Sequence, residues 1–181
     1  MLLQVPGPEP IELTHISEAS LHRLAAGEPV ELEALTVAEG ALPPPKTVAR
    51  ALAQLGLATP AAWCVPFLII STSRATVLGA CGFKTAPVDG RVEISYGLAR
   101  AERGRGIATI AIGKLLERAA ASGLVEEVVA HILPDNVASS RVVARLGFTP
   151  EGPLAGTNGE QVMRWIRRVP DGAPKIGRLR L

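Results

Sequence analysis

Aromatic residues are scarce in this chain. They make up 3% of its 181 residues, whereas hydrophobic residues as a group make up 48% and charged residues 20%. With so few rings, a core has to be built from Ala, Val, Leu and Ile. The apolar content still supports a globular core and argues against an intrinsically disordered chain. The length then predicts one domain, or one domain with an appendage.

Cysteine is equally rare. Cys64 and Cys81 belong to no CxxC pair and no Cys/His cluster, which disfavours a structural zinc site and fits a reducing compartment. No apolar run approaches the ~20 residues of a membrane span. The first residues, MLLQVPGPEP, lack the basic start and long apolar stretch of a signal peptide. We therefore expect a cytoplasmic protein with no metal and no membrane partner.

Positive charge is unevenly distributed. The net charge of +2 is too small to imply an anionic partner by itself. Residues 164–181 nevertheless carry a net +5, which leaves −3 for the rest of the chain. A basic end of this kind could contact nucleic acid, but it lacks the interleaved aromatic residues of a single-strand binder. We expect a solvated end, with one domain over residues 1–170, a basic tail over 171–181 and nucleic acid as a disfavoured partner.

The local patterns alternate between strands and helices. Strands are expected at residues 11–16, 66–71, 75–83, 91–98, 127–133 and 160–169. Helices are expected at residues 17–26, 47–55, from the end of the 103–109 loop to 122, and from 136 to 146. Residues 27–45 are expected to be irregular, and Asp89-Gly90 is a strong hairpin signal. The order predicts an α+β fold, with antiparallel hairpins around one β–α–β–α core.

The stretch RGRGIAT at residues 103–109 joins a predicted strand to a predicted helix. A helix start presents free backbone N–H groups and a partial positive charge, which together suit a phosphate. Gly104 and Gly106 let a ligand approach the backbone closely, and Arg103 and Arg105 add formal charge and forked donors. The loop alone leaves two interpretations open, a diphosphate cradle and a tight turn with two solvated arginines.

Two familiar phosphate-binding patterns do not fit this loop. A P-loop needs GxxxxGK[ST], which is absent, and a dinucleotide fingerprint needs glycine where Thr109 stands. RGRGIA instead resembles the [Q/R]-x-x-G-x-[G/A] element of the Gcn5-related N-acetyltransferase (GNAT) superfamily. The stretch LPDNVASSRVVARLGF at residues 133–148 resembles its second landmark, and is most similar to the ribosomal-protein N-terminal acetyltransferases. The resemblance covers about residues 78–150.

This resemblance implies a GNAT-type single domain, whose mostly antiparallel central sheet splays at an acetyl-CoA cleft and is flanked by helices. Acetyl-CoA would be the co-substrate. A backbone N–H near Leu98 would polarise the thioester carbonyl. The positions that match the superfamily's acetyl-CoA contacts are Leu98, Ala99, Arg103, Gly104, Arg105, Gly106, Ile107, Ala108, Thr109, Asn136 and Ser139.

The reaction that the resemblance implies is attack of an amine on a thioester, which needs a base to remove a proton. Glu93 matches the strand carboxylate that often serves as this base, and the alternative is a solvent-exposed strand residue. Many members place a tyrosine seven residues after the asparagine, where this chain has Val143, which can donate no proton. The resemblance then implies Ser139 as the donor of a proton or a hydrogen bond to the thiolate, with Ser140 in reserve.

Several candidate residues also have plainer interpretations. Asn136 shares a predicted helix face with Ser139, Ser140, Val143 and Gly147, but it could simply cap that helix. Tyr96 alternates with apolar residues and is expected in the core. The three histidines are expected to be structural or exposed; they are His15, His22 and His131.

The acceptor is less well determined than the donor. Residues 27–45 carry four glutamates, which could form an acidic lip that attracts a cationic amine or a solvated loop without a role; they are Glu28, Glu31, Glu33 and Glu39. The resemblance implies a primary amine as acceptor, either a protein N-terminus or a small molecule such as an antibiotic or a polyamine. A non-catalytic acyl-CoA-binding module is the alternative class. A homodimer is left open.

Overall fold

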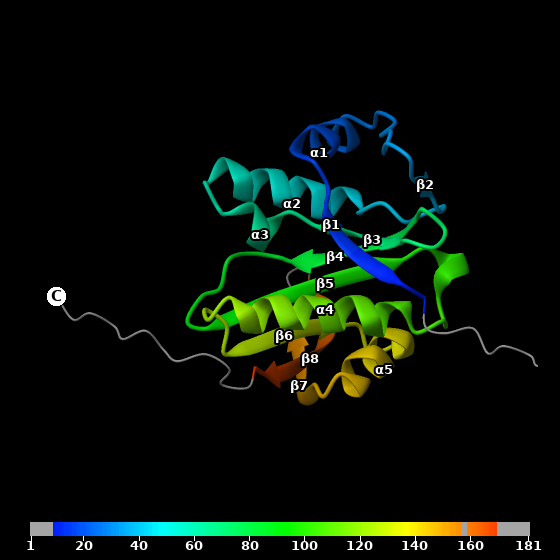
Figure 1. Ribbon diagram of the computed structural model, residues 1–181. Helices are drawn as coiled ribbons and strands as arrows, with labels where there is room; N and C mark the ends of the chain where they lie inside the picture. The colour runs from blue at the N-terminus through cyan, green and yellow to red at the C-terminus, as the bar shows by residue number, and fades with distance from the viewer. Residues whose placement is uncertain (1–8, 157–158, 170–181) are drawn as a thin grey trace, which may run out of the picture.

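Alternating side chains along the strands place one sheet between two layers of helices (Figure 1). The computed structural model describes residues 9–156 and 159–169. Its strands are β1 (Ile11–His15), β2 (Thr36–Val37), β3 (Phe67–Ser71), β4 (Thr76–Phe83), β5 (Arg91–Leu98), β6 (Glu127–Ile132), β7 (Thr149–Ala155) and β8 (Gln161–Arg168). Its helices are α1 (Glu18–Ala25), α2 (Pro45–Gly56), α3 (Ala61–Cys64), α4 (Ile107–Ala121) and α5 (Val137–Arg145), with a 3-10 turn η1 (Arg100–Glu102).

The strands follow the order β1-β3-β4-β5-β6-β8-β7, and the short β2 pairs with β4. Neighbouring strands are antiparallel except for β5 with β6 and β2 with β4. The predicted α+β class, with a mostly antiparallel sheet flanked by helices, is confirmed. The parallel pair β5–β6 lies in the middle of the sheet, and the candidate site is built around it.

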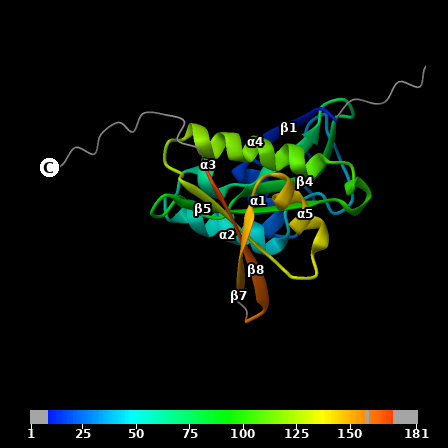
Figure 2. The same cartoon turned by 90° about the horizontal axis from the view of Figure 1, so that it is seen from below.

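The sheet separates two hydrophobic cores, and β3 contributes to both. Phe67 and Ile69 point into the core beneath α4, whereas Leu68 and Ile70 point into the core beneath α1 and α2. This alternation is the two-residue period of a strand that is buried on both faces. Figure 2 shows α4 on one side of the sheet and α2 on the other.

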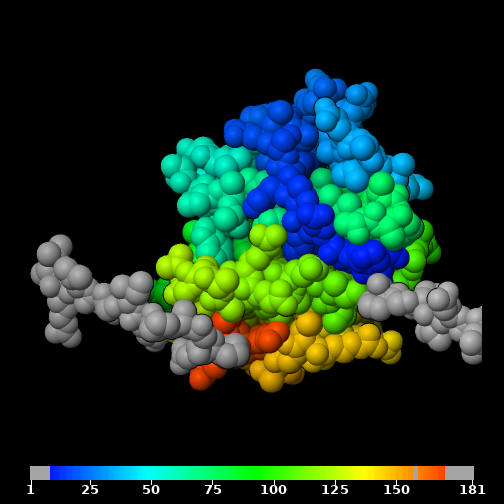
Figure 3. Space-filling view, in the orientation of Figure 1, coloured from blue at the N-terminus to red at the C-terminus, as the bar shows by residue number. Residues whose placement is uncertain are grey.

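Helix α4 is the central element of its layer. Six of its apolar residues are fully or almost fully buried; they are Ile107, Ala111, Ile112, Leu115, Leu116 and Ala119. In the space-filling view α4 lies between β1 and α5 (Figure 3), and it contacts both. A buried helix anchored in this way holds its N-terminal residues, and the loop before them, against the sheet.

The structure corrects two expectations for the C-terminal part. Residues 149–155 form β7, although Pro150, Gly152 and Pro153 make this segment look like a loop. Pairing with β8 imposes the strand, since an edge strand tolerates proline and a bulge lies between Pro150 and Gly152. The basic end also begins inside β8, where Arg164 pairs with Glu127 and Glu151. Residues 171–181 of the predicted tail lie outside the described residues.

Both cysteines are free and buried. None of the described helices combines the length and apolar character that crossing a bilayer requires.

Candidate functional site

The parallel strands β5 and β6 separate after a short paired segment. They are matched at only three positions, of which Glu93 with Val129 is the last. Beyond that position β5 continues to Leu98, paired with β4 alone, and β6 continues to Ile132, paired with β8. A cavity of about 440 Å³ is lined by residues of β5, the 103–109 loop, α4 and α5.

The main chain of β5 has free edge groups at this opening. The N–H of Ala99 donates to the carbonyl of Leu78 at 2.8 Å, and the carbonyl of Glu93 accepts from Lys84 at the same distance. Because hydrogen-bonding direction alternates along a strand, Tyr96 and Leu98 direct their backbone groups toward β6. The N–H of Leu98 therefore faces the opening, whereas that of Ala99 is bonded within the sheet and is not available to a ligand.

The loop before α4 exposes a helix start. Gly104 and Gly106 have φ values of 78° and 77°, in the region that favours glycine. The first backbone bond of α4 runs from the N–H of Ile110 to the carbonyl of Gly106. The N–H groups at residues 107–109 therefore have no partner within the helix. The loop and helix residues that line the cavity are Arg103, Gly104, Gly106, Ile107, Ala108 and Thr109.

The two arginines of the loop point to different places. Arg103 lines the cavity, and its Nε donates to the carbonyl of Leu98 at 3.3 Å. Arg105 instead contacts Glu102 at 2.7 Å and Glu9 at 3.2 Å. The two side chains, predicted together as phosphate ligands, are thus separated by the structure.

Helix α5 closes the other side of the cavity. Asn136 caps it, because its Oδ1 accepts a hydrogen bond from the N–H of Ser139 at 3.1 Å, and both residues line the cavity. Arg141 and Arg145 line it as well. Sequence reasoning missed these two arginines, although their spacing of four residues places them on one helix face. Val143, on the same helix face one to two turns further along, is fully buried in the core, so only the N-terminal end of that face borders the cavity.

Tyr96 reaches from β5 across to α5. Its hydroxyl donates to the backbone carbonyl of Ser139 at 3.1 Å. Burial raises the pKa of the Tyr96 hydroxyl, and this hydrogen bond opposes the shift. The residue packs against the core as predicted, but it also lines the cavity.

Glu93 lies on the opposite face of β5, because strand side chains alternate. Its Oε1 is 2.9 Å from Nδ1 of His131, and it also pairs with Nζ of Lys84. The Glu93 side chain keeps 27% of its surface exposed. Sequence reasoning classed His131 with two unrelated histidines. The parallel register of β5 and β6, which only the structure provides, brings it to Glu93.

Arg50 of α2 adds a further positive charge here. Its Nη2 is 3.4 Å from Oγ of Ser95, and its buried Nε has no hydrogen-bond partner among the described residues. Burial lowers the pKa of the Arg50 guanidinium, and the negative charge of Glu93 opposes that shift. The surroundings of Glu93 are therefore rich in positive charge.

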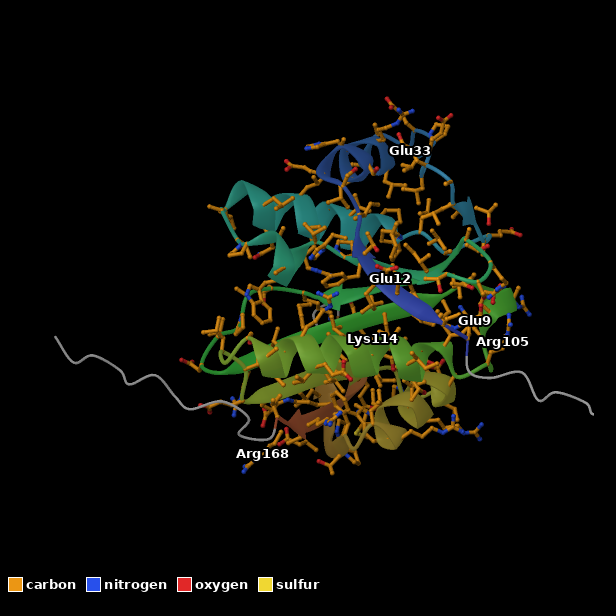
Figure 4. The ribbon with its side chains drawn as sticks, viewed as in Figure 1. Glu9, Glu12, Glu33, Arg105, Lys114 and Arg168 are labelled. Carbon is orange, nitrogen blue, oxygen red and sulfur yellow. The ribbon has the colours of Figure 1, made fainter. Side chains whose placement is uncertain are left out.

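Two of the four glutamates of residues 27–45 can be placed relative to the rest of the molecule. Glu28 pairs with Arg23 at 3.7 Å, and Figure 4 places Glu33 beside α1, well away from Arg105. The acidic lip stays a prediction. Within residues 9–156 and 159–169, no three His, Cys, Asp or Glu side chains gather closely enough to hold a metal ion.

The sequence of this chain is similar to that of a known acetyltransferase over about half its length. An uncharacterized N-acetyltransferase of Bacillus licheniformis is 35% identical over 89 residues, which are 49% of this chain and 50% of that protein. The chain thus matches about half the length of this curated relative.

Solved structures extend the likeness to most of the chain. A ribosomal L7/L12 α-N-protein acetyltransferase in complex with coenzyme A is 20% identical, with a TM-score of 0.66 over 93% of this chain and 99% of that one. An aminoglycoside acetyltransferase in complex with coenzyme A is 18% identical, with a TM-score of 0.63 over 88% and 95%. At these identities the two structures show a shared fold. The family model described as the acetyltransferase (GNAT) domain matches residues 13–149. The predicted resemblance is confirmed, and the chain belongs to the GNAT acetyltransferase family.

Proposed function

We propose that this chain is an acetyl-CoA-dependent N-acetyltransferase that acts on a protein N-terminal α-amine. One observation carries the proposal. Glu93 and His131 lie where β5 and β6 begin to separate, while the 103–109 loop lies at the far end of the same opening. An extended thioester lying along the opening would bring its acyl end toward Glu93 and its phosphates toward α4.

The donor side fits acetyl-CoA, which when bound supplies the activated acetyl group. The N–H groups at residues 107–109 suit a diphosphate. Arg103, Arg141 and Arg145 supply positive charge along the lining. The outward main chain of Tyr96 and Leu98 can pair with an extended amide-bearing arm, as an added strand would. The Leu98 N–H is the proposed donor to the thioester carbonyl.

Glu93 is the proposed base. Both side-chain contacts of its carboxylate, to His131 and Lys84, are made through Oε1. No contact to Oε2 occurs within the described residues, so Oε2 is the atom proposed to take the proton from the acceptor. Since a carboxylate only accepts hydrogen bonds, Nδ1 of His131 must carry its hydrogen. The imidazole thereby orients the carboxylate for this task.

On the leaving-group side, the Ser139 hydroxyl is the proposed hydrogen-bond donor to the thiolate, which then takes its proton from solvent. It lines the cavity at the N-terminal turn of α5. Val143 is buried in the core, and its side chain has no hydrogen-bond donor.

The charge around Glu93 bears on the acceptor. Lys84 pairs with Glu93, and Arg50 lies close enough for its pKa to respond to that carboxylate. These cations repel an acceptor that carries further positive charges, such as a polyamine or an aminoglycoside. An N-terminal α-amine has one positive charge and a neighbouring carbonyl.

An acetylation screen with labelled acetyl-CoA tests this proposal. The acceptors are peptides with a free N-terminus, the same peptides with a blocked N-terminus, spermidine and an aminoglycoside. We expect label on the free peptides alone. Turnover of spermidine or the aminoglycoside in preference to every peptide would point to a small-molecule enzyme, and no turnover with any amine, despite coenzyme A binding, would contradict the proposed activity.

The variant Glu93→Gln separates catalysis from binding in the same assay. We expect kcat to fall roughly 10²-fold to 10⁴-fold, because general-base catalysis contributes about that much. The dissociation constant for coenzyme A should not change, since Glu93 lies away from the phosphate loop. Glu12→Gln is the matched control, because it removes an exposed strand carboxylate from β1, at the far edge of the sheet.

A further inference from the structure

A network of four charged side chains lies behind the phosphate loop. Glu102, the last residue of η1, is only 7% exposed. Arg74, from the turn between β3 and β4, binds it with two parallel hydrogen bonds of 2.9 and 2.8 Å. A forked pair of this kind fixes both partners in orientation as well as distance.

Glu9, two residues before the start of β1, is the fourth member of the network. Its Oε1 accepts from Nε of Arg74 at 3.1 Å and from the hydroxyls of Ser71 and Ser73. Its Oε2 accepts from Arg105 at 3.2 Å. Figure 4 shows Glu9 and Arg105 side by side at this end of the sheet. Three segments far apart in the sequence therefore meet at one charge-balanced cluster of two arginines and two glutamates.

Arg105 connects this cluster to the loop. Its Nη1 lies 2.7 Å from Glu102 and its Nη2 3.2 Å from Glu9, so its two ends bridge two carboxylates. Arg105 also stands between Gly104 and Gly106, both with positive φ. Glycines give a loop many conformations. The anchored Arg105 side chain restricts these conformations, and the residues on either side of it, Gly104 and residues 106–109, line the cavity.

We propose that Glu102, Arg74 and Glu9 act through Arg105 as positioning residues for the diphosphate loop, and that Arg103 alone of the loop arginines contacts the phosphate. This inference depends on the proposed binding of coenzyme A. Arg103 is free of the network and lines the cavity. Arg105 does not line the cavity, and its two terminal nitrogens donate to Glu102 and Glu9, whose negative charges offset its own.

Conservative replacements separate the two roles. A phosphate contact needs a positive charge, which lysine retains, whereas bridging two carboxylates needs the fork of arginine. By isothermal calorimetry with coenzyme A, Arg103→Lys should stay within about threefold of wild type, while Arg103→Ala weakens binding on the order of tenfold. Arg105→Lys should weaken binding about as much as Arg105→Ala. Equal rescue by lysine at both positions would overturn the proposal.

Glu102→Gln tests the network from its buried end. We expect KM for acetyl-CoA to rise on the order of tenfold through lost preorganisation of the loop, with kcat at saturation unchanged. A fall in kcat together with an unchanged KM would contradict a positioning role. Because Glu102 is buried, the thermal unfolding of this variant is measured in parallel. If the variant does not fold, the binding of coenzyme A to Arg105→Lys, whose substitution is at an exposed position, is the test of the network. A wild-type protein that binds no coenzyme A would instead refute the proposed function itself.

Discussion

Nδ1 of His131 lies 2.9 Å from Oε1 of Glu93, across the point where β5 and β6 stop pairing. The two residues are 38 positions apart in the chain and meet because the parallel register brings β6 beside β5. The imidazole is part of the proposed proton-transfer site, since it fixes the carboxylate through a hydrogen bond and is itself 30% exposed to solvent.

We predict that His131→Ala lowers kcat about tenfold and leaves KM for acetyl-CoA unchanged, because the base stays in place but loses its orientation. The double variant with Glu93→Gln should be no slower than Glu93→Gln alone, since residues that act as a unit are not additive. Steady-state kinetics of the four proteins measures this. Multiplied losses in the double variant would show that His131 acts independently of Glu93.

Gly79 of β4 supports the main chain of the cleft. A Cβ at this position would meet the carbonyl of Gly97 and lie 2.9 Å from Cα of Leu98. Gly79→Ala should therefore push β5 outward and lower the free energy of unfolding by about 1–3 kcal/mol, as overpacking does. It should also weaken coenzyme A binding, since Leu98 faces the cavity.

The matched control is Gly56→Ala in α2, where a Cβ meets nothing within 4 Å. In a helix this change is neutral or stabilising by roughly 0.5–1 kcal/mol. Denaturant unfolding of both variants makes the comparison. Equal stability of the two would mean that β4 and β5 are not in close contact at Gly79.

The network behind the loop predicts an acid-sensitive stability. Hydrogen bonds from Arg74 hold the pKa of Glu102 below its ordinary value of 4.5, and a hydrogen bond from Ser71 does the same for Glu9. In the unfolded chain both carboxylates take up protons near pH 4.5, whereas in the folded chain they do so only at lower pH. This stabilisation is therefore complete above pH 4.5 and is lost as the pH falls through the folded-state pKa values.

Unfolding midpoints measured from pH 6 to pH 3 test this dependence. The wild-type midpoint should fall more steeply than that of a variant carrying Glu9→Gln and Glu102→Gln. Glu33→Gln, at an exposed position, should retain the wild-type slope. Parallel curves for all three proteins would exclude the network as the source.

Burial raises the pKa of the Cys81 thiol to about 12, and it raises the pKa of Cys64 as well. At pH 8 roughly one Cys81 side chain in ten thousand is then a thiolate, against about one in ten at the ordinary value of 9.0. Since the thiolate is the reactive form, we predict very slow alkylation of a Cys64→Ser variant in the native state and fast alkylation in denaturant. Rapid labelling of the native protein, followed by mass spectrometry, would contradict this burial.

The same raised pKa values affect stability at alkaline pH. Above pH 9 the thiols of the unfolded chain ionise before those of the folded chain, so the free energy of unfolding should decline as the pH rises.

The sequence allowed the local features of the site to be predicted. RGRGIAT marked a helix start, and capping of the next helix was one of the two roles considered for Asn136, because both features depend on neighbours in the chain. The alternation along β5 also placed Glu93 and Tyr96 on opposite faces. Each of these features is fixed by backbone geometry within a few residues.

The features that were missed depend on distant pairing. β7 is a strand because it pairs with the edge of β8, although the prolines in its sequence disfavour a strand. His131 reaches Glu93 through the β5–β6 register, and Arg105 turns from the cavity because Glu9 and Glu102 meet behind the loop. Arg141 and Arg145 line the cavity because α5 turns Val143 into the core. No local pattern carries this information.

Main-chain amides at the start of α4 are central to the proposed function, because they are the groups proposed to hold the diphosphate. A crystal structure with coenzyme A tests this role directly. We predict the diphosphate on the N–H groups of residues 104–109, Arg103 in contact with it, and the pantetheine arm between β5 and β6. A nucleotide bound elsewhere, with the loop before α4 free of phosphate, would contradict the account.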